Sequence, residues 1–135
     1  MTPDEIRNFV DEFYAMTANG DWEAVDRCIT DDFFVSEAAG LPMEGIYPGR
    51  AGLCELYAKV IGSLDVAAIE REETMVGHDM GVVKLSLRFA DPAVRPAEIL
   101  ELFLFRDGKL AEIKPYYFDP NPVVAAAASK AAQTA

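Results

Sequence analysis

The spacing of apolar residues changes from helical to alternating about halfway along the chain. Near the N-terminus, apolar side chains recur every three or four positions, as in an amphipathic helix, at Ile6, Phe9, Val10, Phe13 and Met16. Thr2 can cap this helix, and Pro3 suits its first position. Asn19-Gly20 then supplies a left-handed stop. The pattern predicts a helix from Pro3 to about Ala18.

Two further helices and a strand are predicted before residue 66. Asp21 can cap a second helix, whose shared apolar face is Trp22, Val25 and Ile29. A strand is expected over residues 31–37. Gly and Pro then recur between residues 38 and 49, so this segment is expected to be a loop that borders a pocket mouth. A third helix should end at Gly62, and its inner stripe is Leu53, Leu56, Tyr57, Val60 and Ile61.

From Asp65 onward, apolar and polar residues alternate, which is the period of a half-buried strand. The alternation is clearest between residues 82 and 89, whereas the parity of the segment before it is ambiguous. Asp107-Gly108 is a strong signal for a tight hairpin between the last two strands. The expected strands are residues 66–76, 82–89, 99–105 and 110–118. Helices followed by antiparallel strands predict an α+β fold in which helices cover one sheet face.

A chain of 135 residues suits one domain. We expect this domain to span residues 1–119 and the Ala-rich tail, residues 120–135, to be a mobile end, because little in its sequence would anchor it. No apolar run reaches the roughly 18 residues of a membrane span, and the first residues lack the basic start of a signal peptide. The sequence therefore predicts a cytoplasmic protein that does not bind membranes.

The chain carries 12 basic and 23 acidic residues, for a formal charge of -11. This balance repels polyphosphates, and the sequence has neither a Lys/Arg cluster nor a phosphate-binding glycine loop, so nucleic acid is not an expected partner.

Cys28 and Cys54 lie on separate predicted helices and are expected to be free thiols. His78, the only histidine, is expected in a turn, with an acid/base role at the pocket rim as the alternative. No cofactor or metal ion is expected.

Two glutamates interrupt apolar strands. Glu37 shares strand parity with Val35, which favours an inward direction. Glu101 lies in the run 99–105, which is apolar on both faces and should therefore be covered on both. A carboxyl group among apolar side chains has a raised pKa, and two such groups in one cavity can divide the roles of base and acid. The alternative for Glu37 is a position facing solvent. The alternative for Glu101 is an ion pair at a subunit interface, with Arg88, Lys114 or Arg71.

The element order and four segments carry a resemblance to a known family. The segments are Ala18–Trp22, Asp31–Val35, Tyr47–Leu53 and Leu102–Lys109. With them, the chain resembles the nuclear transport factor 2-like superfamily, which includes ketosteroid isomerases and SnoaL-like polyketide cyclases, from about Pro3 to Asp119. The resemblance implies a cone-shaped, curved antiparallel sheet packed against three N-terminal helices, with a small-molecule pocket inside the cone.

The resemblance to ketosteroid isomerases also implies roles for individual residues. The general base falls on Glu37, and the hydrogen-bond-donating acid falls on Glu101. A tyrosine on the third helix matches Tyr57. A second tyrosine, on the first helix, falls on Phe13, with Tyr14 one residue later and about 100° around the helix. This departure counts against steroid isomerisation.

The remaining candidates would bind the substrate. The apolar lining is expected to include Phe13, Phe34, Met43, Leu85, Leu87 and Phe103. Further lining positions are Tyr14, Ile113 and Tyr117, where each phenol could donate a hydrogen bond. The apolar outer face of the run 99–105 predicts a homodimer through the sheet.

Two functions fit these residues. The first is a cofactor-independent acid/base enzyme for a small, largely apolar molecule, such as an isomerase, cyclase, dehydratase or epoxide hydrolase. The second is a ligand-binding or dimeric interaction module without turnover, which the missing hydroxyl at Phe13 favours.

Overall fold

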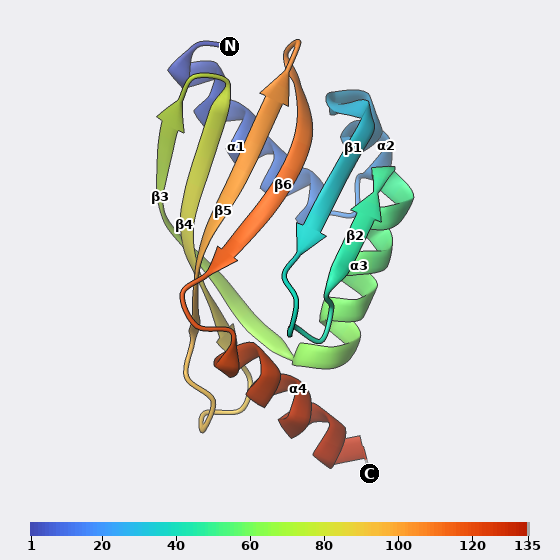
Figure 1. Cartoon of the computed structure of the whole chain (residues 1–135), viewed down its shortest axis with the longest axis vertical. Coiled ribbons are helices and arrows are strands. Elements are labelled where there is room, and N and C mark those ends of the chain that lie inside the picture. The colour runs from blue at the N-terminus through green and yellow to red at the C-terminus, as the bar shows by residue number, and fades with distance from the viewer. Residues whose placement is uncertain (135) are drawn as a thin grey trace.

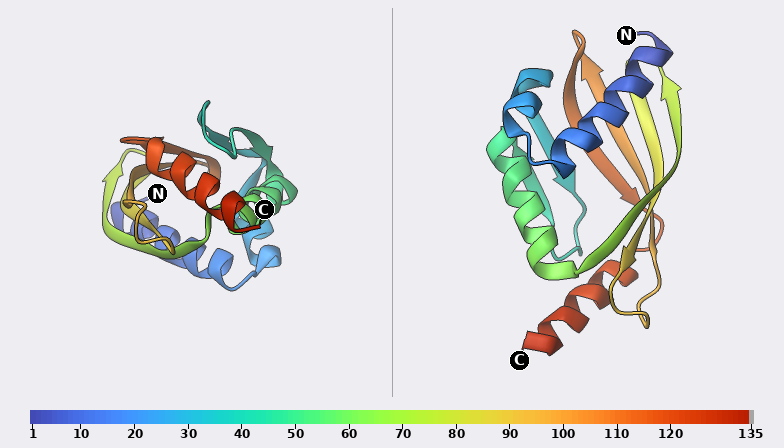
Figure 2. Two further views of the ribbon diagram at one scale, coloured as in Figure 1. Left: turned by 90° about the horizontal axis from the view of Figure 1, so that it is seen from below. Right: turned by 180° about the vertical axis from the view of Figure 1, so that it is seen from behind.

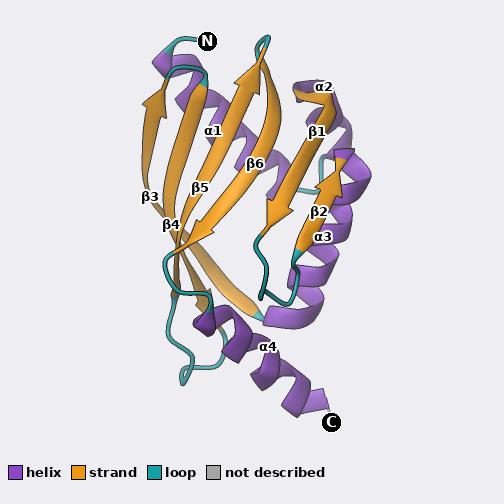
Figure 3. Cartoon of the chain, viewed as in Figure 1, coloured by secondary structure: helices purple, strands orange, loops and turns teal. Residues whose placement is uncertain are grey.

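The computed structural model describes residues 1–134, which form four helices and six strands (Figures 1 and 3). The helices are α1 (Pro3–Ala18), α2 (Trp22–Cys28), α3 (Gly49–Leu64) and α4 (Asn121–Thr134). The strands are β1 (Ile29–Glu37), β2 (Gly45–Pro48), β3 (Val66–Gly77), β4 (Met80–Phe89), β5 (Ala97–Arg106) and β6 (Lys109–Tyr117). The α+β class predicted from the sequence is confirmed.

All six strands form one curved, unclosed sheet in the order β2-β1-β6-β5-β4-β3. The meander from β3 to β6 is antiparallel, as the alternation and the Asp107-Gly108 hairpin predicted. Two features differ from the prediction. The segment expected as a loop contains β2, which pairs antiparallel with β1, and β1 joins the meander by a parallel pairing with β6.

Three helices cover the concave side of this sheet (Figure 2). The first, α1, contacts β3 and β4, whereas α3 contacts β1 and β2. Thr2 caps α1 by accepting a hydrogen bond from the Glu5 amide, as the sequence indicated. The core between the layers is apolar, and its largest fully buried side chains include Phe33, Phe103 and Ile6. The helices and the sheet thus form the walls of a cone.

A close approach between α3 and β2 fixes the loop before them. A Cβ atom at Gly52 would lie 2.4 Å from the carbonyl carbon of Tyr47, so only glycine allows this contact. The buried Tyr47 hydroxyl donates a 2.6 Å hydrogen bond to the carbonyl oxygen of Met43. This arrangement holds the Met43 side chain against the inside of the cone.

The Ala-rich tail, which we expected to lack anchors, forms the helix α4. Val123 and Ala126 are buried in the core cluster. Lys130 Nζ lies 2.7 Å from Asp65 Oδ1 and donates a 3.0 Å hydrogen bond to the carbonyl oxygen of Ile61, at the end of α3. The helix α4 therefore packs against the C-terminal end of α3, as Figure 1 shows.

The end of α3 also differs from the prediction. The helix continues past Gly62 to Leu64 and stops at Asp65, which adopts the left-handed conformation with φ 48°.

Cys28 and Cys54 are free and partly buried. Within residues 1–134, no helix combines the length and the apolar composition that crossing a membrane requires.

Candidate active site

A cavity of about 540 Å³ lies inside the cone, between α1, α3 and the concave face of the sheet. Most of its lining is apolar. Its hydroxyl and carboxyl groups come from Tyr14, Thr17, Glu37, Tyr57, Glu101 and Tyr117. No Lys, Arg or His side chain is among the described residues that line it. Two carboxyl groups therefore share an apolar space without a cation to neutralise them.

The strand register brings the two glutamates onto one row of the inner face. Glu101 on β5 is paired with Pro115 on β6. The parallel pairing of β1 with β6 places Val35 opposite Ile113, and Glu37 lies two residues further along β1. Because residues two apart in a strand point to the same side, Glu37 and Glu101 flank Pro115. Two strand spacings put their Cα atoms roughly 10 Å apart, and both side chains extend into the cavity between them.

Glu101 is hydrogen-bonded to a tyrosine on α1. The Tyr14 hydroxyl donates to Glu101 Oε1 at 2.5 Å. Burial raises the pKa of Glu101, and the hydrogen bond from Tyr14 opposes this rise. Burial and the proximity of Glu101 in turn raise the pKa of Tyr14, so the phenol keeps its proton and remains a donor. Tyr14 and Glu101 thus form a hydrogen-bonded pair in which the pKa of each group is raised above its ordinary value.

Glu37 is the second acid of the cavity, and its pKa is raised as well. Only 8% of its surface is exposed, and burial followed by repulsion from Glu101 raises its pKa to about 8. A hydrogen bond from Tyr117 opposes this rise. Its Oε1 atom is buried and has no hydrogen-bond partner among the described residues. Glu37 thus presents one oxygen that a bound molecule can satisfy.

Tyr57 completes the polar group from the α3 side. Burial raises the pKa of its phenol to about 12, while a hydrogen bond with the Thr17 side chain opposes the rise. The Trp22 ring packs edge-on against the Tyr57 ring at 5.5 Å between centroids, which fixes the phenol. The charge of Glu101 also acts on Tyr57. Three tyrosines from three elements therefore surround the two carboxyl groups.

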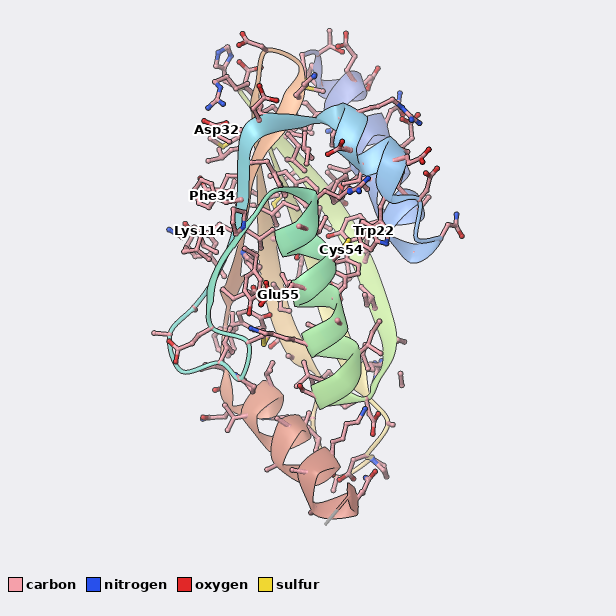
Figure 4. All side chains as sticks on the ribbon, turned by 90° about the vertical axis from the view of Figure 1, so that its right-hand side faces the viewer. Trp22, Asp32, Phe34, Cys54, Glu55 and Lys114 are labelled. Atoms are coloured by element: carbon pink, nitrogen blue, oxygen red, sulfur yellow. The ribbon has the colours of Figure 1, made fainter. Side chains whose placement is uncertain are left out.

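The structure brings most of the predicted site residues to this cavity. The predicted residues on its wall are Phe13, Tyr14, Glu37, Met43, Tyr57, Leu85, Leu87, Glu101, Ile113 and Tyr117. Phe34 and Phe103 are placed elsewhere. Phe34 lies between the inward-facing Phe33 and Val35 and so points to the other face of β1, as Figure 4 shows. Phe103 is fully buried, packs edge-on against Phe13 and is not on the cavity wall.

The alternatives for Glu101 and His78 are also decided by position. Glu101 lines the cavity, whereas Arg88 pairs with Glu70 and Lys114 lies over the Tyr116 ring. His78 is in the turn after β3, and 99% of its side chain is exposed. It does not border the cavity.

Sequence reasoning missed part of the wall. The first four residues of β3, Val66–Ile69, line the cavity, together with Thr17, Ile99 and Pro115. Ile99 and Pro115 share strand parity with Glu101 and Tyr117, and that signal would have located them. The exposed side chains of Ile61 on α3 and Ile69 on β3 both line the cavity, which marks an opening to solvent between these elements.

The cone and its cavity define a protein of the nuclear transport factor 2-like class. A protein of this class from Burkholderia xenovorans LB400 superposes with a TM-score of 0.76 at 18% identity, over 94% of this chain and 98% of that chain. TerC, co-crystallised with polyporic acid, gives a TM-score of 0.73 at 19% identity, over 92% and 98% of the two chains. A protein described as a candidate isomerase from Rhodopseudomonas palustris gives 0.66 at 19% identity, over 96% and 99%. At these identities the likeness shows the fold alone.

The family follows from the sequence. The model of the SnoaL-like domain matches residues 10–113, so the chain belongs to the SnoaL-like family within the nuclear transport factor 2-like superfamily. No functionally curated protein matches it. In residues 1–134, no group of three or more His, Cys, Asp and Glu side chains is arranged to hold a metal ion.

Proposed function

We propose that the protein is a cofactor-independent acid/base enzyme acting on a small, largely apolar and uncharged molecule in the cone. The observation that carries this proposal is the meeting of Glu37 and Glu101 in one apolar cavity, each hydrogen-bonded to its own tyrosine. Titratable groups with strongly shifted pKa values in a cleft are typical of functional sites. A cavity of about 540 Å³ is also within the size range of small-molecule sites.

The two acids would have different roles because their hydrogen-bond partners differ: Tyr14 donates to Glu101, whereas Glu37 has one buried oxygen without a partner among the described residues. Glu37, with a pKa of about 8, is the general base. Its carboxylate takes a proton from a carbon next to a carbonyl group, or from a water molecule. Glu101, in its protonated form, donates a hydrogen bond to the substrate oxygen on which negative charge develops. Tyr14 holds one oxygen of Glu101, which leaves the other for the substrate.

Several reactions need this pair of groups. Isomerisation, aldol-type cyclisation, dehydration and epoxide hydrolysis all combine a base with a donor that stabilises an oxygen. The candidate isomerase among the structural neighbours and the neighbour co-crystallised with polyporic acid support a small-molecule reaction in this fold. The uncharged character of the substrate is proposed because the cavity lining, as far as residues 1–134 describe it, offers no cation to a carboxylate or phosphate.

The alternative is a ligand-binding module of the same fold without turnover. Phe13 favoured it at the level of the sequence, because a tyrosine was expected there. In the structure, the Phe13 ring is part of the apolar cavity wall, and the neighbouring Tyr14 provides the hydroxyl to Glu101. The hydroxyl of Tyr14 therefore supports the enzyme over a module without turnover.

The test begins with a thermal-shift screen of steroids, lactones, epoxides and polyketide-like aromatics. A compound at 100 times its dissociation constant stabilises the fold by about 2.7 kcal/mol. Compounds that bind are then assayed for turnover with wild type, Glu37→Gln and Glu12→Gln, the last an exposed control on α1. We expect Glu37→Gln to lose on the order of 10²-fold or more in turnover and Glu12→Gln to lose none. Binding with equal turnover in all three proteins contradicts the assignment of Glu37.

We further propose a homodimer through the outer face of the sheet. Leu100 and Tyr116 are paired across β5 and β6 and are 43% and 51% exposed, and the nearby Phe118 is 83% exposed. Lys84 and Glu98 border the same apolar groove, so two copies related by a two-fold axis can pair opposite charges around it. Light scattering should give twice the chain mass at micromolar concentration, and Leu100→Lys should give the monomer mass. A wild-type monomer contradicts the dimer.

A further inference from the structure

An arginine outside the cavity contacts Tyr14, the tyrosine that donates a hydrogen bond to Glu101. The guanidinium carbon of Arg71, on β3, lies 4.5 Å from the centroid of the Tyr14 ring. Arg71 Nη1 is also 2.9 Å from Asp11 Oδ1, one helical turn before Tyr14 on α1. Arg71 is not on the cavity wall, so it would not touch a substrate. Asp11, Arg71, Tyr14 and Glu101 instead form a continuous series of contacts from the surface to the site.

An irregularity in β3 lies directly after Arg71. Arg71 is paired with Leu85, whose side chain faces the cavity, so Arg71 is on the inner side of the sheet. The next paired positions are Glu73 and Lys84, so the register shifts by one residue and Glu72 is accommodated as a bulge. Glu72 pairs with Lys84 at 2.9 Å. A bulge of this kind re-aims side chains near functional sites.

The cation–π contact with Arg71 has an electrostatic effect on the acidity of the Tyr14 phenol. A guanidinium over an aromatic face is attracted to the ring, and its positive charge stabilises the deprotonated phenol relative to the neutral one. Of the groups that act on Tyr14, burial and Glu101 raise its pKa, whereas Arg71 lowers it. A more acidic phenol is a stronger hydrogen-bond donor. The donation from Tyr14 to Glu101 Oε1 is therefore stronger with Arg71 in place than without it.

We propose that Arg71 is a positioning residue for the acid of the site: it holds the Tyr14 ring and strengthens its hydrogen bond to Glu101, and Asp11 anchors Arg71. No bond is broken in this coupling. Donation to Oε1 draws electron density from Glu101, which makes a proton on the other oxygen a better donor to a substrate oxygen. The catalytic consequence rests on the proposed function, but the coupling of Arg71 to Glu101 does not.

The charged and titratable groups around Glu101 come from five elements. Tyr14 and Asp11 are on α1, Tyr57 on α3, Glu37 on β1, Arg71 on β3 and Tyr117 on β6. Arg71 is the only cation among those named, so its removal changes the balance in one direction. A direct charge effect on Glu101 and an effect through Tyr14 have the same sign, and the experiment must separate them.

A double-mutant cycle separates the two effects. The carboxyl ¹³C shift of Glu101 is followed against pH in ligand-free wild type, Arg71→Met, Tyr14→Phe and the double variant. We expect Arg71→Met to raise the pKa of Glu101 by about half a unit, the equivalent of an exposed cation–π contact. In the Tyr14→Phe background the same substitution should have a clearly smaller effect. An equal shift in both backgrounds would leave only a long-range charge effect and overturns the proposal.

Asp11→Ala gives an independent test with an opposite expectation. Through charge alone, removal of an acid lowers the pKa of Glu101. If Asp11 anchors Arg71, its removal frees the guanidinium from the ring, and the pKa of Glu101 rises instead. A lowered pKa in Asp11→Ala contradicts the anchoring role. Arg88→Met is the matched control. It removes an arginine that forms an exposed ion pair with Glu70, between β4 and β3, and that does not contact Tyr14.

Turnover measurements distinguish this inference from the proposed function. With an active enzyme, Arg71→Met should lower kcat about 2- to 5-fold with a smaller change in KM, Arg71→Lys should recover part of the loss, and Arg88→Met should be unchanged. One outcome is that wild type turns over none of the compounds that it binds, while the pKa of Glu101 shifts as predicted for the double-mutant cycle. That result supports the coupling of Arg71 to Glu101 and contradicts the proposed enzyme activity. If kcat falls without the pKa shift, Arg71 acts only on the fold.

Discussion

Glu37 and Glu101 extend into the same cavity from strands that only β6 separates, and the charge of each disfavours the charge of the other. Two acids in this relationship lose their protons in sequence rather than together. Glu37 has a pKa of about 8, which burial and repulsion from Glu101 raise above its ordinary value. Both the stability and the activity of the protein should therefore depend on pH around this value.

The stability prediction concerns Glu37→Gln. The pKa of Glu37 is about 8 in the fold and 4.5 for the ordinary carboxyl group, so between these values the folded state binds more protons than the unfolded chain. Wild-type stability should therefore fall as the pH rises through this window. Glutamine does not ionise, so Glu37→Gln avoids this loss of stability. Above the window, its free energy of unfolding should exceed that of wild type by a few kcal/mol, the order of magnitude that such a pKa shift implies.

Urea unfolding of wild type and Glu37→Gln at pH 4.5 and pH 9 measures this gain. The free energies of unfolding should be similar at the lower pH and should differ at the higher one. Glu12→Gln is the control, since this residue is exposed on α1. A constant difference between the proteins at both pH values contradicts a raised pKa for Glu37.

The activity prediction concerns the same group. If Glu37 is the base, kcat/KM should rise with pH to a plateau above about pH 8, because Glu37 must lose its proton before it can accept one. Tyr117→Phe removes a hydrogen bond that lowers the pKa of Glu37. The rising limb of the profile should therefore move to higher pH in this variant. A pH profile that is identical in wild type and Tyr117→Phe assigns the limb to another group.

Regular periodicity made much of this fold predictable. The apolar stripe of α1 and the alternation of β4 predicted these two elements correctly, because each element buries one face along its whole length. The segment β2 was missed because it has only four residues and ends in Pro48. Its strand geometry depends on pairing with β1, which local sequence does not encode. The parallel pairing of β1 with β6 is likewise a contact between distant segments.

The limits within the site have similar physical causes. The run 99–105 is apolar on both faces, so its pattern alone did not tell which face carries Glu101. The inner face of β3 was unclear because the register shifts twice, after Val66 and after Arg71, and each shift reverses the alternation. The family resemblance placed the helical hydroxyl at Phe13, whereas the structure has it one residue later, at Tyr14.

A ligand prediction follows from the missing cation in the cavity wall. For any neutral compound that binds in the thermal-shift screen, a derivative with a carboxylate in place of an amide should bind at least about tenfold more weakly. The reason is that a buried carboxylate without a partner is strongly disfavoured, and Glu37 and Glu101 would repel it. Calorimetric titration at pH 8 measures both affinities. Equal affinity for the two compounds would mean that the ligand binds outside this cavity.

Adjacent valines on α4 test whether this helix belongs to the core. Val123 is fully buried, whereas Val124 is 43% exposed on the same helix. Val123→Ala should lower the free energy of unfolding by about 2 kcal/mol, because it leaves a cavity that the surroundings fill only partly. Val124→Ala should change it by less than about 0.5 kcal/mol, or raise it slightly, since alanine is the better helix former. Urea unfolding at pH 7 distinguishes the two. Equal, small effects would show that α4 does not contribute to the core in solution, and a loss at Val123 alone would place residues 121–126 within the folding unit.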